Sequence, residues 1–332
     1  MSNNKDFKVK NGIKPTVYHE AVGTVVSGGV GYNIAGASYD SVSFSVAGQD
    51  TAPFGIAFNN SGTKMYMVGP SSDSVHQYTL STAFDLSTAS YDSVSFSVSG
   101  QDANPAGIAF NNGGSKMYMV GYGNDRVYQY SLSTAFDLST ASYDSVSLYV
   151  VNQDTIPRSI AFNNDGTKMY MVGTGNDRVA QYGLSTAFDL STASYDSVSF
   201  SVSGQDTDPF CIAFNTDGTK MYIVGTTSGS VYQYSLSTAF DLSTASYDSV
   251  SFSVASQDAS PLDIAFNNDG TKMYTVGGTN DTIYQYSTVL NTASLDLSTG
   301  NVFEITPTSD IQVSLTNPAA SGTSSGATLL LD

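Results

Sequence analysis

The sequence predicts an all-β fold, a five-bladed β-propeller. A unit of 52 residues begins at Tyr39, Tyr91, Tyr143, Tyr195 and Tyr247, so five copies take up about three quarters of the 332 residues. Each copy has four short segments rich in Val, Ile, Phe and Tyr, divided by Gly, Asn, Asp, Pro and Ser, which is the composition of strands and turns. A four-stranded unit repeated at about 50 residues is typical of a propeller blade, because radial packing covers both faces of each small sheet.

The pattern within a copy predicts the order of its strands. In the first copy the four segments are 42–46, 54–58, 64–68 and 75–80. Residues 56–58 and 65–68 are apolar on both faces, as in strands buried on both sides. Residues 41–46 alternate polar and apolar, as in a strand with one solvated face, so we expect this type of strand to be outermost.

A turn signal separates the second and third segments of every copy. Residues 163–168 read Asn-Asn-Asp-Gly-Thr-Lys, and close relatives start at Asn59, Asn111, Asn215 and Asn267. Asp-Gly between two apolar runs supplies the positive φ values of a tight hairpin.

The chain enters its first copy on the type of strand expected to be outermost (42–46). It leaves the fifth copy on the type of strand expected to lie third from the centre (283–287). We therefore expect the N-terminal strand to complete the last blade and close the ring. The expected organisation is a basic arm and Gly-rich lead-in at 1–36, the propeller at 37–292 and a β extension at 293–332. Strands are expected there at 302–306, 311–315 and 327–331, too few to be stable without a partner.

Composition argues against several classes of function. The formal charge of −17 and pI near 4.1 disfavour nucleic-acid binding, which needs Lys and Arg against phosphates. No apolar run is long enough for a membrane span or a signal-peptide core, so we expect neither membrane insertion nor classical secretion. The single Cys211 cannot form an intrachain disulfide, and we expect it to be buried or in a loop.

The inventory for catalysis is small. His19 and His76 are the only histidines, and the aspartates stand in repeated turn positions. We expect no enzyme and no cofactor; glycoside hydrolysis by two carboxylates is the alternative. A Gln-Asp pair precedes the inner strand of each copy, starting at Gln49, Gln101, Gln153, Gln205 and Gln257. These aspartates could form a ring that holds calcium, but we favour Asx-type turns in which each bonds its own loop, and expect no metal.

Differences between the copies are concentrated at one rim. We count the strands of a blade from the centre outward. In an antiparallel meander, the loop from the fourth strand to the first strand of the next blade and the loop from the second strand to the third emerge at the same rim. These loops vary between copies, so we call this rim the varied rim and the opposite one the constant rim. A fixed scaffold with variable loops is a common recognition surface. The candidate binding residues are Phe54, Asp73, Tyr122, Asp125, Arg126, Arg158, Asp177, Arg178, Phe210, Leu262 and Asp263. Drift of exposed loops between duplicated units is the alternative.

Two resemblances add to this interpretation. Residues 160–173, Ile-Ala-Phe-Asn-Asn-Asp-Gly-Thr-Lys-Met-Tyr-Met-Val-Gly, resemble the repeats of YVTN- and NHL-type propellers, which implies the fold but no activity. Residues 5–13 and 300–331 look like segments of structural proteins of marine-type tailed bacteriophages. This resemblance implies a virion component assembled in the host cytoplasm and exposed on the particle as a fibre, knob or decoration.

In that role we expect the two terminal segments to bind other virion proteins, the chain to form homo-oligomers, and the ring to recognise a host-surface glycan or protein. Receptor binding and passive decoration remain open. A bacterial surface or secreted propeller adhesin is the alternative to a phage protein.

Overall fold

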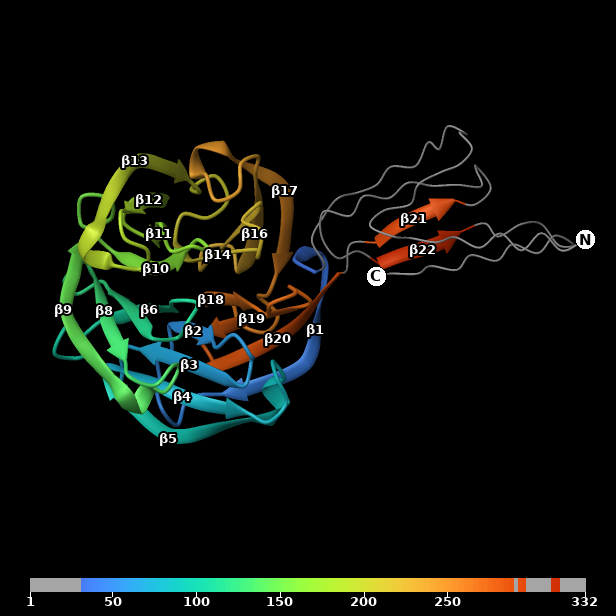
Figure 1. The fold of residues 1–332 in the computed structure, drawn as a ribbon. Helices are drawn as coiled ribbons and strands as arrows, with labels where there is room; N and C mark the ends of the chain where they lie inside the picture. The colour runs from blue at the N-terminus through green and yellow to red at the C-terminus, as the bar shows by residue number, and fades with distance from the viewer. Residues whose placement is uncertain (1–30, 290–291, 297–311, 317–332) are drawn as a thin grey trace, which may run out of the picture. The chain divides into compact units, whose positions relative to one another are not determined.

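The computed structural model describes residues 31–289, 292–296 and 312–316. Tyr32–Val289 form one compact unit built from five four-stranded antiparallel sheets, which are the blades of a ring. Figure 1 shows β2, β6, β10, β14 and β18 nearest the centre and β5, β9, β13, β17 and β1 on the outside. The five-bladed propeller expected from the repeat is confirmed.

The strands of each blade run from the centre outward in this order. Blade 1 has β2 (Gly55–Phe58), β3 (Lys64–Gly69), β4 (Ser74–Leu80) and β5 (Ala89–Ser97). Blade 2 has β6 (Pro105–Phe110), β7 (Lys116–Gly121), β8 (Arg126–Leu132) and β9 (Ala141–Tyr149). Blade 3 has β10 (Pro157–Phe162), β11 (Lys168–Gly173), β12 (Arg178–Leu184) and β13 (Ala193–Ser201). Blade 4 has β14 (Pro209–Phe214), β15 (Lys220–Gly225), β16 (Ser230–Leu236) and β17 (Ala245–Ser253). Blade 5 has β18 (Pro261–Phe266), β19 (Lys272–Gly277), β20 (Thr282–Val289) and β1 (Asn33–Ser45).

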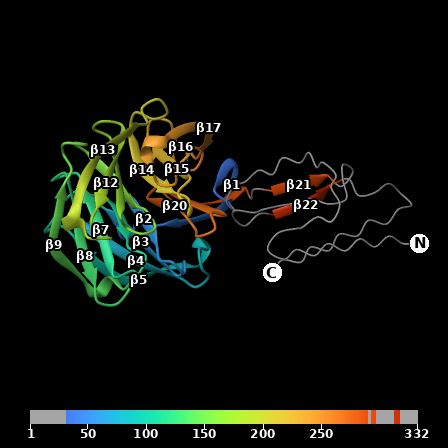
Figure 2. The same ribbon diagram turned by 45° about the horizontal axis from the view of Figure 1, so that its top comes forward.

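Burial explains this order. In β3 every residue after Lys64 is buried, whereas β5 alternates between half-buried and exposed residues along most of its length. The alternating strand therefore forms the outer wall, which is seen from another side in Figure 2. The apolar residues of neighbouring blades pack together in continuous clusters, so that each blade depends on the next.

The turn between the first and second strands of a blade, counted from the centre, follows the predicted hairpin signal, which reads Asn-Asn-Ser-Gly-Thr-Lys in blade 1. Gly62 has φ +68°, its amide donates to the Asn59 carbonyl at 2.9 Å, and the Asn59 amide donates to the Lys64 carbonyl at 3.0 Å. A Cβ on Gly62 would lie 2.2 Å from the Phe84 ring, so only glycine fits. The predicted positive φ falls on the glycine, within the five-residue loop between β2 and β3.

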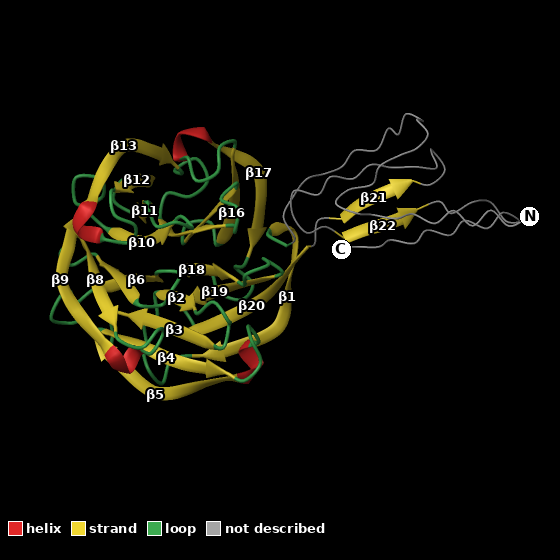
Figure 3. Cartoon of the chain, viewed as in Figure 1, coloured by secondary structure: helices red, strands yellow, loops and turns green. Residues whose placement is uncertain are grey.

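A short 3₁₀ helix precedes the outer strand of blades 1 to 4. The four helices are η1 (Leu86–Thr88), η2 (Leu138–Thr140), η3 (Leu190–Thr192) and η4 (Leu242–Thr244), drawn in red in Figure 3. Asp85 caps η1 by accepting the Ser87 amide at 3.0 Å. The Leu86 amide donates to Gln285 Oε1 of the preceding blade at 3.0 Å, so each helix also joins two blades.

The N-terminal strand closes the ring, as the sequence predicted. β1 pairs antiparallel with β20, and it is longer than the predicted 42–46 because it starts at Asn33. Tyr32 has φ 59°, the same as Phe84, and its amide donates to the Gly270 carbonyl at 2.7 Å as Phe84 does to Gly62. Tyr32-Asn33-Ile34 thus take the place of the Phe-Asp-Leu that opens the 3₁₀ helix elsewhere.

Beyond the ring, β21 (Thr292–Asp296) and β22 (Gln312–Thr316) form a parallel pair in which Thr292 lies opposite Gln312. β22 matches the strand expected at 311–315, while β21 was not predicted. The strands expected at 302–306 and 327–331, His19 and the basic arm lie outside the described residues. In the described part of the chain, no helix is long and apolar enough to span a membrane.

Candidate binding surface on the varied rim

The Gln-Asp aspartates hold the loops of the varied rim together. Asp154 is buried; its Oδ1 accepts the amides of Ile156 at 2.8 Å and Gly175 at 3.0 Å, and its Oδ2 accepts the Asn176 amide at 3.0 Å. The first bond is the expected Asx turn, and the other two reach across to the loop between second and third strands. The other four aspartates make corresponding bonds: Asp50, Asp102, Asp206 and Asp258. The carboxylate oxygens of all five aspartates therefore accept hydrogen bonds from main-chain amides of the loops.

The residue pairs that differ most between copies lie at the ring axis. In blades 2 to 5 both members of each pair lie within the inner strand, and in blade 1 this strand starts at the second member, Gly55. The outer member of each pair forms what we call the rim layer: Phe54, Ala106, Arg158, Phe210 and Leu262. The inner member forms the lower layer: Gly55, Gly107, Ser159, Cys211 and Asp263. Eight of these ten residues line one space at the axis that has no room for a water molecule.

Arg158 is the centre of the rim layer. Its guanidinium carbon lies 4.2 Å from the centre of the Tyr122 ring, 4.5 Å from that of Phe210 and 5.5 Å from that of Phe54. Its Nε and Nη1 are buried without a hydrogen-bond partner, and burial lowers the pKa of the Arg158 guanidinium. An arginine side chain stays charged at neutral pH, so contact with aromatic faces takes over part of the stabilisation that water would give.

The aromatic residues around Arg158 also contact one another. Phe54 stacks on Tyr122 with ring centres 6.1 Å apart, and meets Phe210 edge-on at 5.8 Å. Phe54, Tyr122 and Arg158 are half-buried, whereas Phe210 is 8 % exposed. Residues from blades 1 to 4 thus form one cluster, which we call the arginine cluster.

The lower layer is polar and buried. Asp263 Oδ2 accepts the Ile56 amide of blade 1 at 2.5 Å, and its Oδ1 accepts its own neighbour's amide, Ile264, at 2.9 Å. Burial raises the pKa of Asp263 to about 7. Ser159 Oγ donates to Cys211 Sγ at 3.5 Å, and Cys211 is buried, as expected. A Cβ on Gly55 would lie 2.6 Å from the Ala106 carbonyl oxygen, so the inner strands approach too closely there for a side chain.

Three candidate aspartates occupy the loops between second and third strands. Asp73, Asp125 and Asp177 have φ between 48° and 54°. The carbonyl of Asp125 accepts the Val150 amide at 3.0 Å, and Asp73 and Asp177 make the equivalent bond. Burial, and then neighbouring aspartates, raise the pKa of Asp125 and Asp177. These residues shape the loops that carry the two remaining arginines.

Arg126 and Arg178 lie farther out, at the start of the third strands. Arg126 lies over the Tyr149 ring, 5.1 Å from its centre, and donates to Ser147 Oγ at 3.0 Å. Arg178 is exposed and donates to Ser199 Oγ at 3.4 Å. Tyr149 is 52 % exposed, and the sequence analysis did not single it out. Its signal was present, because the other copies have Ser at this position.

The structure thus brings six of the predicted residues to the axis, four of them in the arginine cluster, and places the other five in or beside the loops between second and third strands. Phe54, Tyr122, Arg158 and Phe210 form the arginine cluster, whereas Leu262 and Asp263 are each 6 % exposed and pack the axis. Variation between copies occurs in two places here, in exposed loops and in the packing of different side chains around one axis. Within the described ranges, no three His, Cys, Asp or Glu residues are placed to hold a metal ion.

The chain is similar to several solved structures at low sequence identity. No protein-family model and no curated protein matches the chain. Among solved structures, a candidate 6-phosphogluconolactonase from Bacteroides uniformis is 12 % identical, with 71 % of this chain and 68 % of that chain covered and a TM-score of 0.46. A protein of unknown function from Desulfotomaculum acetoxidans is 13 % identical, with the same coverage and TM-score. A second candidate 6-phosphogluconolactonase, from Bacteroides fragilis, is 13 % identical, with 71 % of both chains covered and a TM-score of 0.44. Similarity at this level carries no information about the activity of this chain.

Proposed function

We propose that this chain is a non-enzymatic protein of a tailed-phage particle that displays its propeller for recognition of a host-surface glycan or protein. The arginine cluster is the observation that carries the recognition part. A guanidinium held among three aromatic rings is the kind of site that dominates binding surfaces, where Tyr, Trp and Arg supply most of the energy. It lies at the centre of the rim whose loops differ between copies.

The rigidity of this rim supports the proposal. Each buried Gln-Asp aspartate fixes two loops at once, so the varied side chains are presented in one conformation. Rigid presentation reduces the entropy lost on binding. The assignment to a phage particle rests on the resemblance of residues 5–13 and 300–331, and the oligomeric state remains a proposal with it.

The repeat itself supplies variants that should keep the fold. Blades 1 and 4 have Ser74 and Ser230 where blades 2 and 3 have Arg126 and Arg178, and blades 3 and 4 have Thr where blade 2 has Tyr122. The triple variant Tyr122→Thr, Arg126→Ser, Arg178→Ser therefore copies residues that other blades already accept. Ser61→Asp on the constant rim copies Asp165, Asp217 and Asp269, and is the matched control.

The test is binding of the labelled full-length chain to a panel of marine bacterial isolates. We expect saturable binding to some isolates, loss of about tenfold or more in affinity for the triple variant, and none for Ser61→Asp. Equal binding by native chain and triple variant would contradict recognition by this rim. Immunogold labelling of phage particles with antibodies against the chain tests the particle assignment separately.

A further inference from the structure

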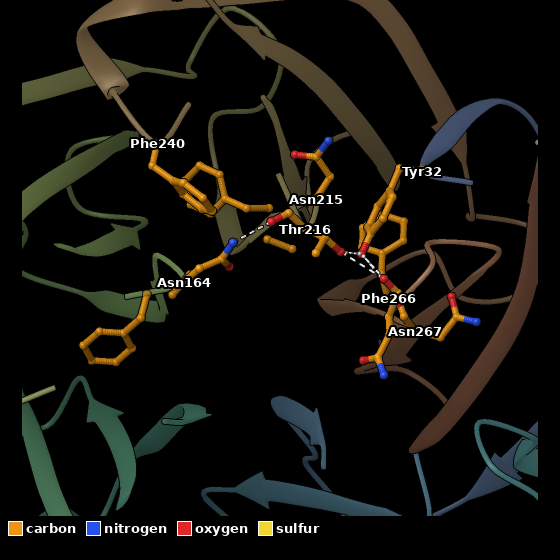
Figure 4. Close-up of a pocket in the computed structure, with 12 residues that line it drawn as sticks. Tyr32, Asn164, Asn215, Thr216, Phe240, Phe266 and Asn267 are labelled. Carbon is orange, nitrogen blue, oxygen red and sulfur yellow. Dashed lines mark hydrogen bonds between the residues drawn. The ribbon is translucent and has the colours of Figure 1, made fainter. Parts of the chain in front are cut away.

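The constant rim has a cavity of its own at the ring axis. It has a volume of about 310 Å³ and lies over blades 3 to 5. Its lining includes Ala161 and Ala213 of the inner strands, the rings of Phe162 and Phe214, and the turn residue Asn164, which is labelled in Figure 4. The volume is at the lower end of the roughly 300–1,000 Å³ range of ligand pockets, which suits a ligand of one ring.

A closed belt of hydrogen bonds surrounds this end of the axis. Asn60 Nδ2 donates to the Asn112 carbonyl at 2.6 Å, and Asn112 and Asn164 each donate to the corresponding residue of the next blade at 2.5 and 2.7 Å. Thr216 Oγ1 donates to the Asn268 carbonyl at 2.9 Å, and Asn268 Nδ2 closes the circle on the Asn60 carbonyl at 2.6 Å. We call these five residues the amide belt.

The amide belt leaves hydrogen-bonding groups free. All five residues are exposed, and each asparagine uses one N–H in the belt, while no described residue donates to its Oδ1. An amide can donate two hydrogen bonds and accept two. The belt therefore presents fixed donors and acceptors side by side, already oriented by the bonds between blades.

The cavity lies on the side of the axis where the repeat departs from its pattern, at blades 4 and 5. Thr216 replaces the belt asparagine, and Tyr32 replaces the phenylalanine found in other blades. The Tyr32 hydroxyl lies 2.8 Å from Thr216 Oγ1 and donates to the Asn267 carbonyl at 3.2 Å (Figure 4). Asn164, Thr216 and Asn268 line the cavity, whereas Asn60 and Asn112 do not.

The lining determines the class of ligand. It contains no charged side chain, and the exposed carboxylates of Asp165, Asp217 and Asp269 in the same turns disfavour an anion. Amides match the hydroxyl groups of a sugar, and alanine methyls with aromatic rings match the C–H face of a pyranose. We propose that this cavity binds a neutral hexopyranose, such as a terminal residue of a glycan.

Substitution to Thr tests the amides without breaking the belt. Thr216 shows that Thr keeps the bond to the next carbonyl while it removes the amide. Asn164→Thr and Asn268→Thr change cavity residues; Asn60→Thr and Asn112→Thr change belt residues outside the cavity and are the matched controls. Melting temperatures of all four should be similar.

The probes are glucose, galactose, mannose and N-acetylglucosamine, titrated singly into the full-length chain and followed by saturation-transfer NMR and calorimetry. We expect at least one to bind with a Kd of about 1 mM, about −4 kcal/mol, and to lose about tenfold in affinity in Asn164→Thr and Asn268→Thr only. Absence of saturation by all four sugars, or an equal loss in the two control variants, would overturn the proposal.

Tighter binding of glucuronate or of glucosamine than of the neutral sugars would overturn the choice of a neutral ligand. Because this cavity and the arginine cluster are on opposite rims, each proposal fails or survives independently.

Discussion

The hydroxyl of Tyr222 donates a hydrogen bond of 2.6 Å to the main-chain oxygen of Tyr32, 190 residues away in sequence. In the other blades the equivalent tyrosine bonds the carbonyl of a phenylalanine, as Tyr66 does with Phe136 at 2.5 Å. The N-terminal residues therefore close the ring by reproducing a contact that the repeat makes everywhere else. Closure of the propeller therefore involves Tyr32, which precedes β1, as well as the strand β1 itself.

Tyr32 is expected to be a principal contributor to this closure. Its ring packs on Gly270 and lies 5.2 Å from the Phe266 ring, so Tyr32→Ala should cost about 3–5 kcal/mol. Tyr32→Phe restores the residue of the other blades and loses only the hydroxyl bonds, at about 1 kcal/mol. Urea unfolding measures both. Equal stability of the two variants would show that the aromatic side chain of Tyr32 does not stabilise the closed propeller.

Gln233, in the blade next to the one that the N-terminal strand completes, lacks a hydrogen bond that the equivalent glutamine makes in other blades. Gln77 Oε1 accepts the Leu138 amide at 2.9 Å, whereas Gln233 Oε1 is buried without a partner. Both glutamines donate through Nε2 to an aspartate at 2.8 Å. Gln77→Leu should therefore cost about 1–3 kcal/mol more than Gln233→Leu, because only the former leaves a buried amide unpaired. Chemical denaturation of the pair checks this, and a difference near zero would refute it.

Gly183 weakens the ion pair of blade 3. Lys64 and Asp92 are 2.6 Å apart, and Thr79 adds a bond of 2.6 Å to Asp92; blade 3 has Gly183 in place of Thr79, and Lys168 and Asp196 are 3.3 Å apart. Burial alone would raise the pKa of Asp92, but its bonds from Lys64, Thr79 and Gln77 outweigh this and hold the pKa low.

Gly183→Ser should restore the missing donor and stabilise the protein by about 1 kcal/mol, since Asp196 can move away from the new Cβ. Thermal unfolding is the measurement. As control, Ser131→Gly in blade 2 should destabilise by a similar amount. Destabilisation by Gly183→Ser would mean that Asp196 cannot make room.

Asp263 should make stability depend on pH. Its pKa is raised to about 7 in the folded protein and is near 3.9 when unfolded, so the folded state holds the extra proton. Stability is therefore greatest below about pH 4 for this group and falls by about 4 kcal/mol as pH rises to about 7. Asp263→Ser, which copies Ser159, should remove this dependence.

The difference in unfolding free energy between the native chain and Asp263→Ser, followed from pH 4 to 8, isolates this effect. Burial lowers the pKa of His76, so its contribution is lost as pH falls, but both proteins share it. If the difference in unfolding free energy stays constant with pH, the pKa of Asp263 is not raised in the folded protein.

Local periodicity was sufficient to predict most of the fold. The alternation at 41–46 placed the outer strand, and the Asp-Gly turns placed the hairpins, because both depend on neighbours in sequence. Tyr32 was not recognised as a stand-in for Phe84, since its role depends on a contact with Gly270 that only the closed ring creates.

The site was predicted less completely for the same reason. Arg126 and Arg178 lie beside the loops of the varied rim, but the loops alone could not show that Leu262 and Asp263 lie at the axis, where they are buried. Nor could they show the amide belt. Its asparagines were seen only as part of a turn, and their bonds run between blades.

The unlike side chains of the lower layer have a consequence for the history of the repeat. Elsewhere the five units are nearly interchangeable, so unequal recombination between copies would readily produce genes with four or six of them. At the axis Gly55 and Gly107 allow the inner strands of blades 1, 2 and 3 to approach closely, and a unit with Asp, Cys or Ser in either place would bring a side chain against the backbone of the next strand. Because only blades 1 and 2 have glycine at this position, the five units are not interchangeable, and a gene product in which their order has changed would pack poorly at the axis.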